Sequence, residues 1–163
     1  MPSVESTTAP DPNDRPGVVA LPPLIYLAAL ILAFALDFVF PLRPSLPPVV
    51  RGVGVGLMVV AVALGGLARA QFVRARTNVN PMQAATSLVT RGAFRWSRNP
   101  MYLGMTGLLV GFALATRMAW ALILLVPVLG IMHWGVVLRE ERYLARKFGA
   151  EYEAYRSRVR RYL

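Results

Sequence analysis

The feature that most constrains this chain is a set of four long apolar stretches. Residues 52–68, 100–116 and 118–138 carry no charge, and residues 21–40 carry only Asp37. Seventeen helical residues reach about 25 Å, so these stretches and their flanks are long enough to cross a bilayer core. We therefore predict an all-α integral membrane protein with about four transmembrane helices, at residues 21–40, 49–70, 100–116 and 118–138.

The composition supports this class and sets the domain organisation. Of the 163 residues, 56% are hydrophobic and 16% are charged, whereas a soluble domain carries about 25% charged residues. The length allows one domain, at residues 21–163, with a cytoplasmic loop at 71–99 and a cytoplasmic tail at 139–163. Residues 1–20 hold four prolines and no apolar period, which predicts a disordered tail and not a signal peptide.

The last two spans are separated only by Thr116 and Arg117, which predicts a tight antiparallel hairpin. Such a hairpin returns the end of the fourth span to the place where the third begins. Two G-x-x-x-G spacings, 52/56 and 107/111, indicate close packing between helices in lipid. Close approach of the backbone to a ligand is the alternative for these glycines.

Lysine and arginine indicate the orientation, because they are enriched in cytoplasmic segments. If the C-terminal tail is cytoplasmic, 15 of the 18 basic residues lie on that side, and only Arg43, Arg51 and Arg117 lie outside. We predict a multi-pass protein of the inner, cytoplasmic membrane with both termini in the cytoplasm. This topology explains the net charge of +10 without nucleic acid and makes membrane lipids the expected partners. No obligate protein partner is inferred.

Several kinds of chemistry are excluded by composition. The chain has no cysteine and one histidine, His133, so disulfides, thiolate nucleophiles and the usual metal centres are not expected. Two ionisable residues lie within apolar spans, Asp37 and His133. Such residues are candidates for function, although Asp37 is close enough to the end of its span to reach water.

Most polar residues lie in the loop and the tail, so we expect function at the cytoplasmic membrane face. The loop ends at Asn99-Pro100, a typical helix start with Asn as the cap. Its free N–H groups and three nearby arginines predict an anion site, and an interfacial anchor is the alternative. In the tail, apolar and aromatic residues recur at helical spacing from Tyr143 through Val159 and Tyr162. This pattern predicts an amphipathic helix with a kink or break at Gly149. This tail is either an interfacial helix or a lid over a cofactor.

Two segments resemble the isoprenylcysteine carboxyl methyltransferase and phospholipid methyltransferase superfamily. The first is residues 88–104, LVTRGAFRWSRNPMYLG, and the second is Glu140-Glu141-Arg142-Tyr143-Leu144 followed by residues 147–152 and Tyr155. The resemblance covers roughly residues 77–163. Because the two segments occur in the right order around a helical hairpin, they are more specific together than either is alone.

The resemblance implies an integral membrane methyltransferase that uses S-adenosyl-L-methionine. In that family the cofactor lies at the cytoplasmic face, between the loop, the hairpin ends and the C-terminal helix. The positions that would contact it here are Thr86, Ser87, Leu88, Val89, Phe94, Asn99, Pro100, Met101, Tyr102 and Glu140. We assign Arg139 and His133 to the substrate, name no catalytic residue and expect no metal.

The chain departs from the family pattern at three positions. Eukaryotic members have His-Pro where this chain has Asn99-Pro100, and Tyr where it has Phe94. A family arginine assigned to the substrate falls on Val136. These changes leave cofactor binding more secure than the identity of the acceptor, which is an isoprenylcysteine-like carboxylate, a phospholipid amine or another lipid-like group.

Two other functions stay open at this level. The first is an NADPH-dependent membrane reductase, since some of these end in a similar Arg-x-Pro-x-Tyr region. The second is a small four-helix membrane protein without enzyme activity, such as a transporter, although few polar groups lie within the spans. Methyl transfer from a sulfonium is an in-line displacement that depends mainly on positioning and shielding. It therefore requires neither a nucleophilic cysteine nor a metal.

The acidic pair after the fourth span gives the sharpest expectation. Glu140 should accept hydrogen bonds from the polar part of the cofactor. Glu141 lies about 100° away around a helix. Its replacement by Gln should therefore weaken cofactor binding less than the replacement of Glu140 by Gln. The alternative is that both carboxylates are solvated surface.

Overall fold

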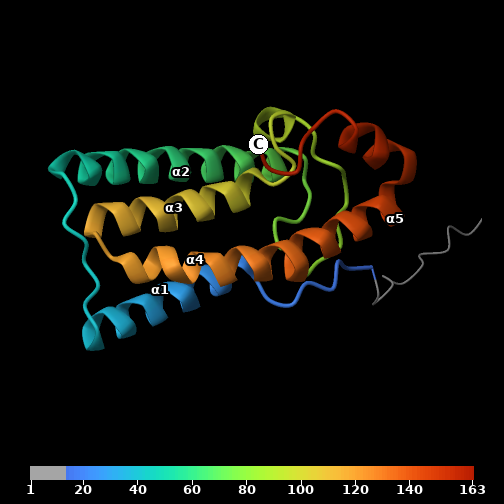
Figure 1. The fold of residues 1–163 in the computed structure, drawn as a ribbon. Helices are drawn as coiled ribbons and strands as arrows, with labels where there is room; N and C mark the ends of the chain where they lie inside the picture. The colour runs from blue at the N-terminus through green and yellow to red at the C-terminus, as the bar shows by residue number, and fades with distance from the viewer. Residues whose placement is uncertain (1–13) are drawn as a thin grey trace, which may run out of the picture.

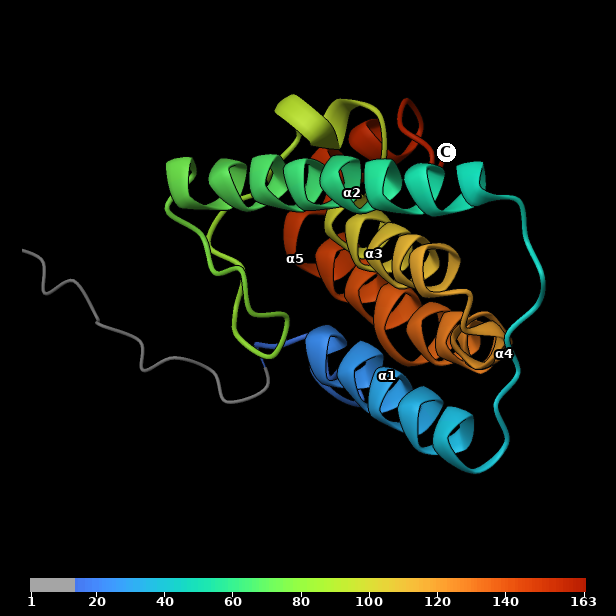
Figure 2. The same ribbon diagram turned by 90° about the vertical axis from the view of Figure 1, so that its left-hand side faces the viewer.

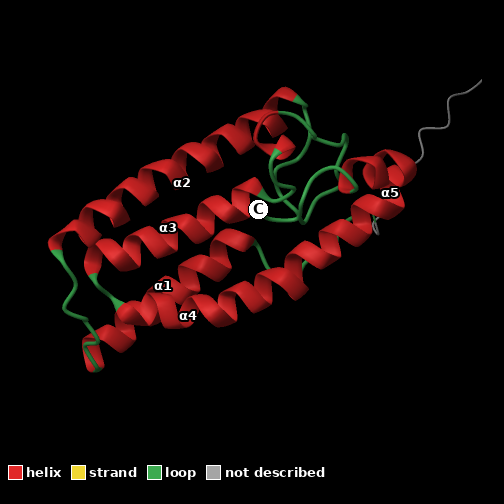
Figure 3. Cartoon of the chain, turned by 45° about the horizontal axis from the view of Figure 1, so that its top comes forward, coloured by secondary structure: helices red, strands yellow, loops and turns green. Residues whose placement is uncertain are grey.

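The computed structural model describes residues 14–163 (Figure 1), so the predicted disorder of residues 1–13 lies outside the described residues. Over the described part, the cartoon contains helices and loops and no strand (Figure 3). The predicted all-α class is therefore confirmed. The elements are α1 (Pro22–Val39), α2 (Pro48–Arg74), η1 (Gly92–Arg95), α3 (Pro100–Thr116), α4 (Ala119–Gly130), η2 (Ile131–Val137) and α5 (Leu138–Arg156).

Within residues 14–163, three helices are long and apolar enough to cross a membrane. They are α1, α2 and the stretch from Ala119 to Arg156, which runs through α4, η2 and α5. The fourth apolar helix, α3, has 17 residues and packs against α2 and α4. Proline occupies the start of α1, α2 and α3, where its missing N–H group costs nothing and its fixed φ suits the helix.

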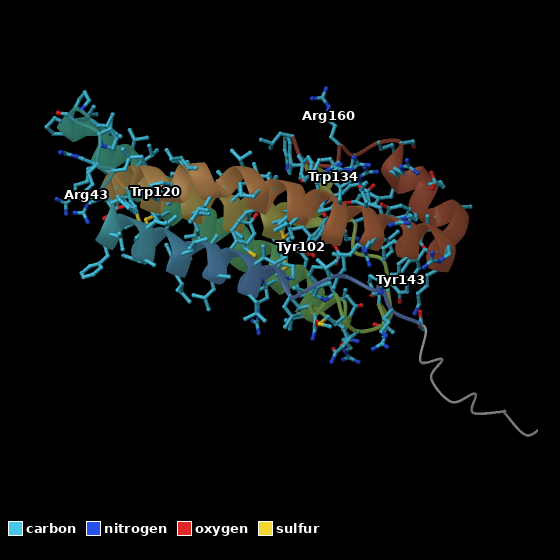
Figure 4. All side chains as sticks on the ribbon, turned by 60° about the horizontal axis from the view of Figure 1, so that its bottom comes forward. Arg43, Tyr102, Trp120, Trp134, Tyr143 and Arg160 are labelled. Atoms are coloured by element: carbon cyan, nitrogen blue, oxygen red, sulfur yellow. The ribbon has the colours of Figure 1, made fainter. Side chains whose placement is uncertain are left out.

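The four long helices lie side by side in the order α2, α3, α4, α1 (Figures 1 and 2). The connections α1–α2 and α3–α4 are at one end of the bundle. The segment between α2 and α3, α5 and both ends of the described chain are at the other, which we call the loop end (Figure 1). In Figure 4, Arg43 and Trp120 mark the opposite end, whereas Tyr143 lies at the loop end. The predicted hairpin thus brings the start of α3 close to the region where α5 begins.

Glycine and alanine form the contact between α2 and α3. A Cβ atom on Gly54 would lie 2.6 Å from the Gly111 carbonyl oxygen, and one on Gly111 would lie 2.7 Å from the Gly54 oxygen. The 107/111 spacing therefore serves helix packing, as predicted. At Gly52 and Gly56 a Cβ atom would have no neighbour within 4 Å, so this second spacing does not pack within the chain.

The fourth span continues without a loop into the first part of the tail, up to Gly149. Pro127 lies inside α4, and the following π-helix, η2, widens the turn before α5 begins. At Gly149 the backbone has φ 49° and ψ −124°, which confirms the predicted break, because glycine tolerates a positive φ. The helix ends at Arg156, so the expected extension through Val159 and Tyr162 is wrong. Residues 157–163 instead return toward the start of α3, held by the hydrogen bonds described below.

Residues 14–21 pack against the fourth helix, and we call them the N-terminal strap. The Val19 amide donates to the Gly135 carbonyl at 3.1 Å, Arg139 Nη1 donates to the Gly17 carbonyl at 2.8 Å, and Val18 is buried. The sequence analysis assigned residues 14–20 to a disordered tail. Their order here rests on long-range contacts, which composition does not reveal.

Candidate functional site

A cavity of about 410 Å³ lies at the loop end, within the size range of small-molecule sites. It lies where the strap, the loop between α2 and α3, the start of α3 and α5 converge. Nine of the predicted cofactor residues line it: Ser87, Leu88, Val89, Phe94, Asn99, Pro100, Met101, Tyr102 and Glu140. The structure therefore brings together residues from both segments of the resemblance.

Three other predicted site residues have different positions. Thr86 does not line the cavity and donates its hydroxyl to the Arg76 carbonyl at 3.1 Å. Arg139 is exposed and binds the strap. His133 lies within η2, where Nδ1 is 2.9 Å from the Tyr162 hydroxyl. Asp37 is far from this region and pairs with Arg43 at the opposite end of the bundle.

Tyr102 and Glu140 meet inside the cavity. The Tyr102 hydroxyl lies 2.9 Å from each carboxylate oxygen of Glu140. Glu140 lies beyond the apolar part of its helix, which ends at Leu138. Burial raises the pKa of the Glu140 carboxyl to about 7, although the hydrogen bond from Tyr102 acts in the opposite direction. This group can therefore gain or lose a proton near neutral pH.

Glu141 joins two arginines that are distant from each other in the sequence. One carboxylate oxygen lies 2.9 Å from Arg98 Nη2, and the other lies 2.8 Å from Arg161 Nη2. The side chains of Glu141 and Arg98 are only 11% and 9% exposed. The alternative of a solvated acidic pair is therefore wrong for Glu141. Its replacement should destabilise the fold, because it would leave the buried Arg98 without its counterion.

Arg98 also has hydrogen-bonding capacity left over. Its Nε and Nη1 atoms are buried without a partner among the described residues, and Arg98 lines the cavity. A buried guanidinium with free donors is suited to an anion, since carboxylates accept from such N–H groups in a bidentate manner. The sequence analysis counted Arg98 only among the arginines of the loop. Its pairing with Glu141 joins distant parts of the chain, so the sequence alone carried no signal that singled Arg98 out.

Asn99 has a different role from the one predicted. It forms no side-chain cap on α3, and its Nδ2 atom donates to the Arg161 carbonyl at 2.9 Å. Ser97 Oγ donates to the same carbonyl at 3.2 Å, and the Arg98 amide donates to the Arg160 carbonyl at 3.0 Å. The start of α3 is therefore fastened to the returning C-terminal segment, because the Asn99 side chain satisfies a carbonyl there.

The tail contributes an aromatic wall. Tyr152 and Tyr155 line the cavity, and the Tyr155 hydroxyl donates to the Phe94 carbonyl at 2.8 Å. Phe72 meets Phe94 edge to face, with ring centroids 5.2 Å apart. Of the two interpretations of the tail, these contacts favour the lid. The individual tyrosines were missed because an amphipathic pattern does not say what its apolar face covers.

Comparison with known proteins agrees with this geometry. The family model described as phospholipid methyltransferase matches residues 49–151, more than half of the chain. No match was found among curated proteins or among solved structures. The matched part includes α2, η1, α3, α4 and the acidic pair of α5. The family implies a membrane methyltransferase that acts on lipid-like substrates. The resemblance noted in the sequence is thus confirmed, and the chain belongs to the phospholipid methyltransferase family.

Proposed function

We propose that this protein transfers a methyl group from S-adenosylmethionine to a lipophilic acceptor at the cytoplasmic face of the inner membrane. The acceptor is an isoprenylcysteine-like carboxylate, a phospholipid amine or a related lipid group. The observation that carries the proposal is the cavity itself. It combines unpaired donors on Arg98 with the Tyr102–Glu140 pair, inside the part of the chain that matches the family.

The polar groups of the cavity suit this cofactor. The free N–H groups of Arg98 can hold its carboxylate, and Glu140 can accept hydrogen bonds from its amine or its ribose hydroxyls. Phe94, Tyr152 and Tyr155 offer aromatic surface to its base. When bound, S-adenosylmethionine supplies the methyl group of its sulfonium centre.

The chain's own contribution is to position and shield the reactants. Tyr152 and Tyr155 of the tail line the cavity. Tyr155 fastens the tail to the Phe94 carbonyl, and Glu141 and Asn99 fasten the returning C-terminal segment. Such a site excludes water and orders the reacting groups, which is most of what an in-line methyl transfer requires. A carboxylate acceptor would need no base, whereas an amine would have to lose a proton.

Glu140→Gln should weaken the binding of S-adenosylhomocysteine by about ten- to a hundredfold, since a charge-assisted hydrogen bond contributes roughly 1.5–3 kcal/mol. Isothermal titration calorimetry of the detergent-purified protein measures this, with NADPH as a competing ligand. The control is Glu153→Gln, which removes an exposed carboxylate on the same helix that is paired only with Arg156. Equal affinities in the two variants, or binding of NADPH instead, would argue against the proposal.

The affinity for S-adenosylhomocysteine should also depend on pH. The pKa of Glu140 is about 7 without ligand, and donors on the ligand would lower it in the complex. The protonated acid must then lose its proton on binding, so the affinity should rise by about tenfold from pH 6 to pH 8. The same titration on Glu140→Gln should be nearly flat. An affinity that falls over this range would mean that the protonated acid is the binding form.

The proposed orientation can be tested separately. We propose that both termini are cytoplasmic, because 15 of the 18 basic residues then lie on that side. Alkaline phosphatase fused after Leu163 should be inactive, and the same reporter fused after Ser45, between α1 and α2, should be active. The reverse pattern would place the cavity on the outer face.

A further inference from the structure

The cavity has two ends. They pack against different apolar clusters, and only one of them is completed by residues that precede the region that matches the family. At one end, Leu88, Val89 and Met101 pack in the apolar cluster around Phe94 and Tyr155. At the other end, Tyr102 and Met105 pack against the cluster that contains the buried residues of α1. The Tyr102–Glu140 pair thus lies between a loop-and-tail wall and a wall next to α1.

The wall next to α1 is built partly by residues outside the family match. Pro16, Leu21, Pro22 and Pro23 line the cavity, but the matched region begins only at residue 49. These residues belong to the strap and to the first turn of α1. One end of the site is therefore made mainly from the matched region, and the other is completed by a segment that lies outside it.

This second wall adjoins the membrane. Leu24 and Leu27, one and two turns beyond Leu21, are 55% and 50% exposed on a helix that is apolar enough to span a bilayer. Leu21 itself is half-buried and lines the cavity. An alkyl chain lying along the start of α1 could therefore reach the cavity without crossing the polar loop.

One acidic residue adds side-chain contacts that fix the start of the strap, beyond the contacts of residues 17–19. Asp14 accepts a hydrogen bond from the Tyr143 hydroxyl at 2.9 Å and forms an ion pair with Lys147. Tyr143 is buried and also accepts from the Ala85 amide of the loop at 3.0 Å. The Tyr143 hydroxyl thus joins the strap, the loop and α5 at a single point.

We propose that the strap forms the acceptor wall of the cavity, that Leu21 limits which acyl or prenyl chain enters, and that Asp14 is the positioning residue that holds this wall. The inference rests on the proposed function, because it assigns the other end of the same cavity to the cofactor. It adds that selection among lipophilic acceptors depends on residues 14–23, outside the domain shared with the family.

Filling the acceptor end tests the role of Leu21. The full chain in nanodiscs of phosphatidylethanolamine and phosphatidylglycerol is transferred to detergent, and retained lipid is counted by native mass spectrometry. Leu21→Trp should retain at least tenfold less phosphatidylethanolamine than the parent, with affinity for S-adenosylhomocysteine unchanged within twofold. The matched control is Leu24→Trp, which places the same ring on the lipid-facing surface. Equal retention in both variants, or no retained lipid in the parent, would overturn the inference.

Releasing the strap tests Asp14 without adding bulk. Asp14→Asn should speed the loss of retained phosphatidylethanolamine at least fivefold. Asp14→Glu should bring the loss rate most of the way back to that of the parent, and Glu153→Gln should leave the rate unchanged. A loss rate in Asp14→Asn equal to that of the parent would remove the positioning role.

The outcomes of the two lipid experiments can be separated from the outcome for the proposed function. Failure of the parent to bind S-adenosylhomocysteine would reject the methyl donor but leave the lipid result intact, and unchanged lipid retention would reject only the strap.

Discussion

Replacing Glu141 by Gln is expected to lower the free energy of unfolding by about 3 kcal/mol, near the low end of the cost of breaking a buried ion pair. The side chain of Glu141 is 11% exposed and neutralises Arg98, which is 9% exposed. Its other partner, Arg161, is 30% exposed and would recover part of its solvation. The variant therefore leaves one cation buried without its counterion and detaches the C-terminal segment from α5.

Thermal unfolding in detergent should show this loss as a fall of about 10 °C in the midpoint, from the usual scaling for a chain of this size. The affinity for S-adenosylhomocysteine should fall as well, since Arg98 would lose the contact that orients it. Glu153→Gln is again the matched control, because its ion pair with Arg156 is exposed on both sides and such pairs contribute little. A midpoint unchanged from the parent would show that Arg98 and Arg161 find other partners.

The sequence ranked the two acidic residues only by their expected effect on cofactor affinity and gave Glu141 no structural role, for a physical reason. An α-helix separates neighbours by about 100°, which suggested that only one of them could face the site. Both line the cavity, because their partners come from different directions: Tyr102 from within α3, Arg98 from the residues before it and Arg161 from the returning C-terminus. Helical phase alone does not contain that information.

The fold class was accessible from the sequence because hydropathy is a local property. Apolar length predicted the four spans, and Asn99-Pro100 marked the start of the third, without any tertiary information. The continuity of the fourth helix was not accessible. It passes through the π-helix η2, and one π-turn changes the phase of every residue that follows. The sequence therefore did not show that the charged tail continues the helix of the fourth span.

Nine of the ten cofactor positions carried over from the resemblance line the cavity, and the errors share one cause. Thr86 was carried over together with residues 87–89, but its hydroxyl is used by the Arg76 carbonyl. The strap was assigned to a tail because four prolines and scattered charges cannot form a core. Its order depends on contacts with Gly135, Arg139 and Tyr143. These contacts join residues that are distant along the chain, and a single sequence does not show which distant residues meet.

Gly111→Ala should destabilise the protein by about 3 kcal/mol, at the upper end of the usual cost of overpacking. The added Cβ would lie 2.7 Å from the Gly54 carbonyl oxygen and 3.0 Å from the Met58 amide nitrogen. Both are backbone atoms of α2, so the clash can be relieved only if the two helices separate. Gly54→Ala should have a similar effect, since its Cβ would meet the Ala115 nitrogen and the Gly111 oxygen at 2.6 Å.

The control lies on the same helix as Gly54. A Cβ at Gly52 or Gly56 meets nothing within 4 Å, so alanine there should leave the unfolding midpoint unchanged or raise it slightly, because alanine favours helix over glycine by up to about 1 kcal/mol. Since α3 begins at the cavity with Pro100, Met101 and Tyr102, a displaced α3 should also weaken the binding of S-adenosylhomocysteine. Equal midpoints and affinities for Gly111→Ala and Gly56→Ala would show that α2 does not fix the position of α3. The placement of Tyr102 against Glu140 would then depend on the tail and the C-terminal segment alone.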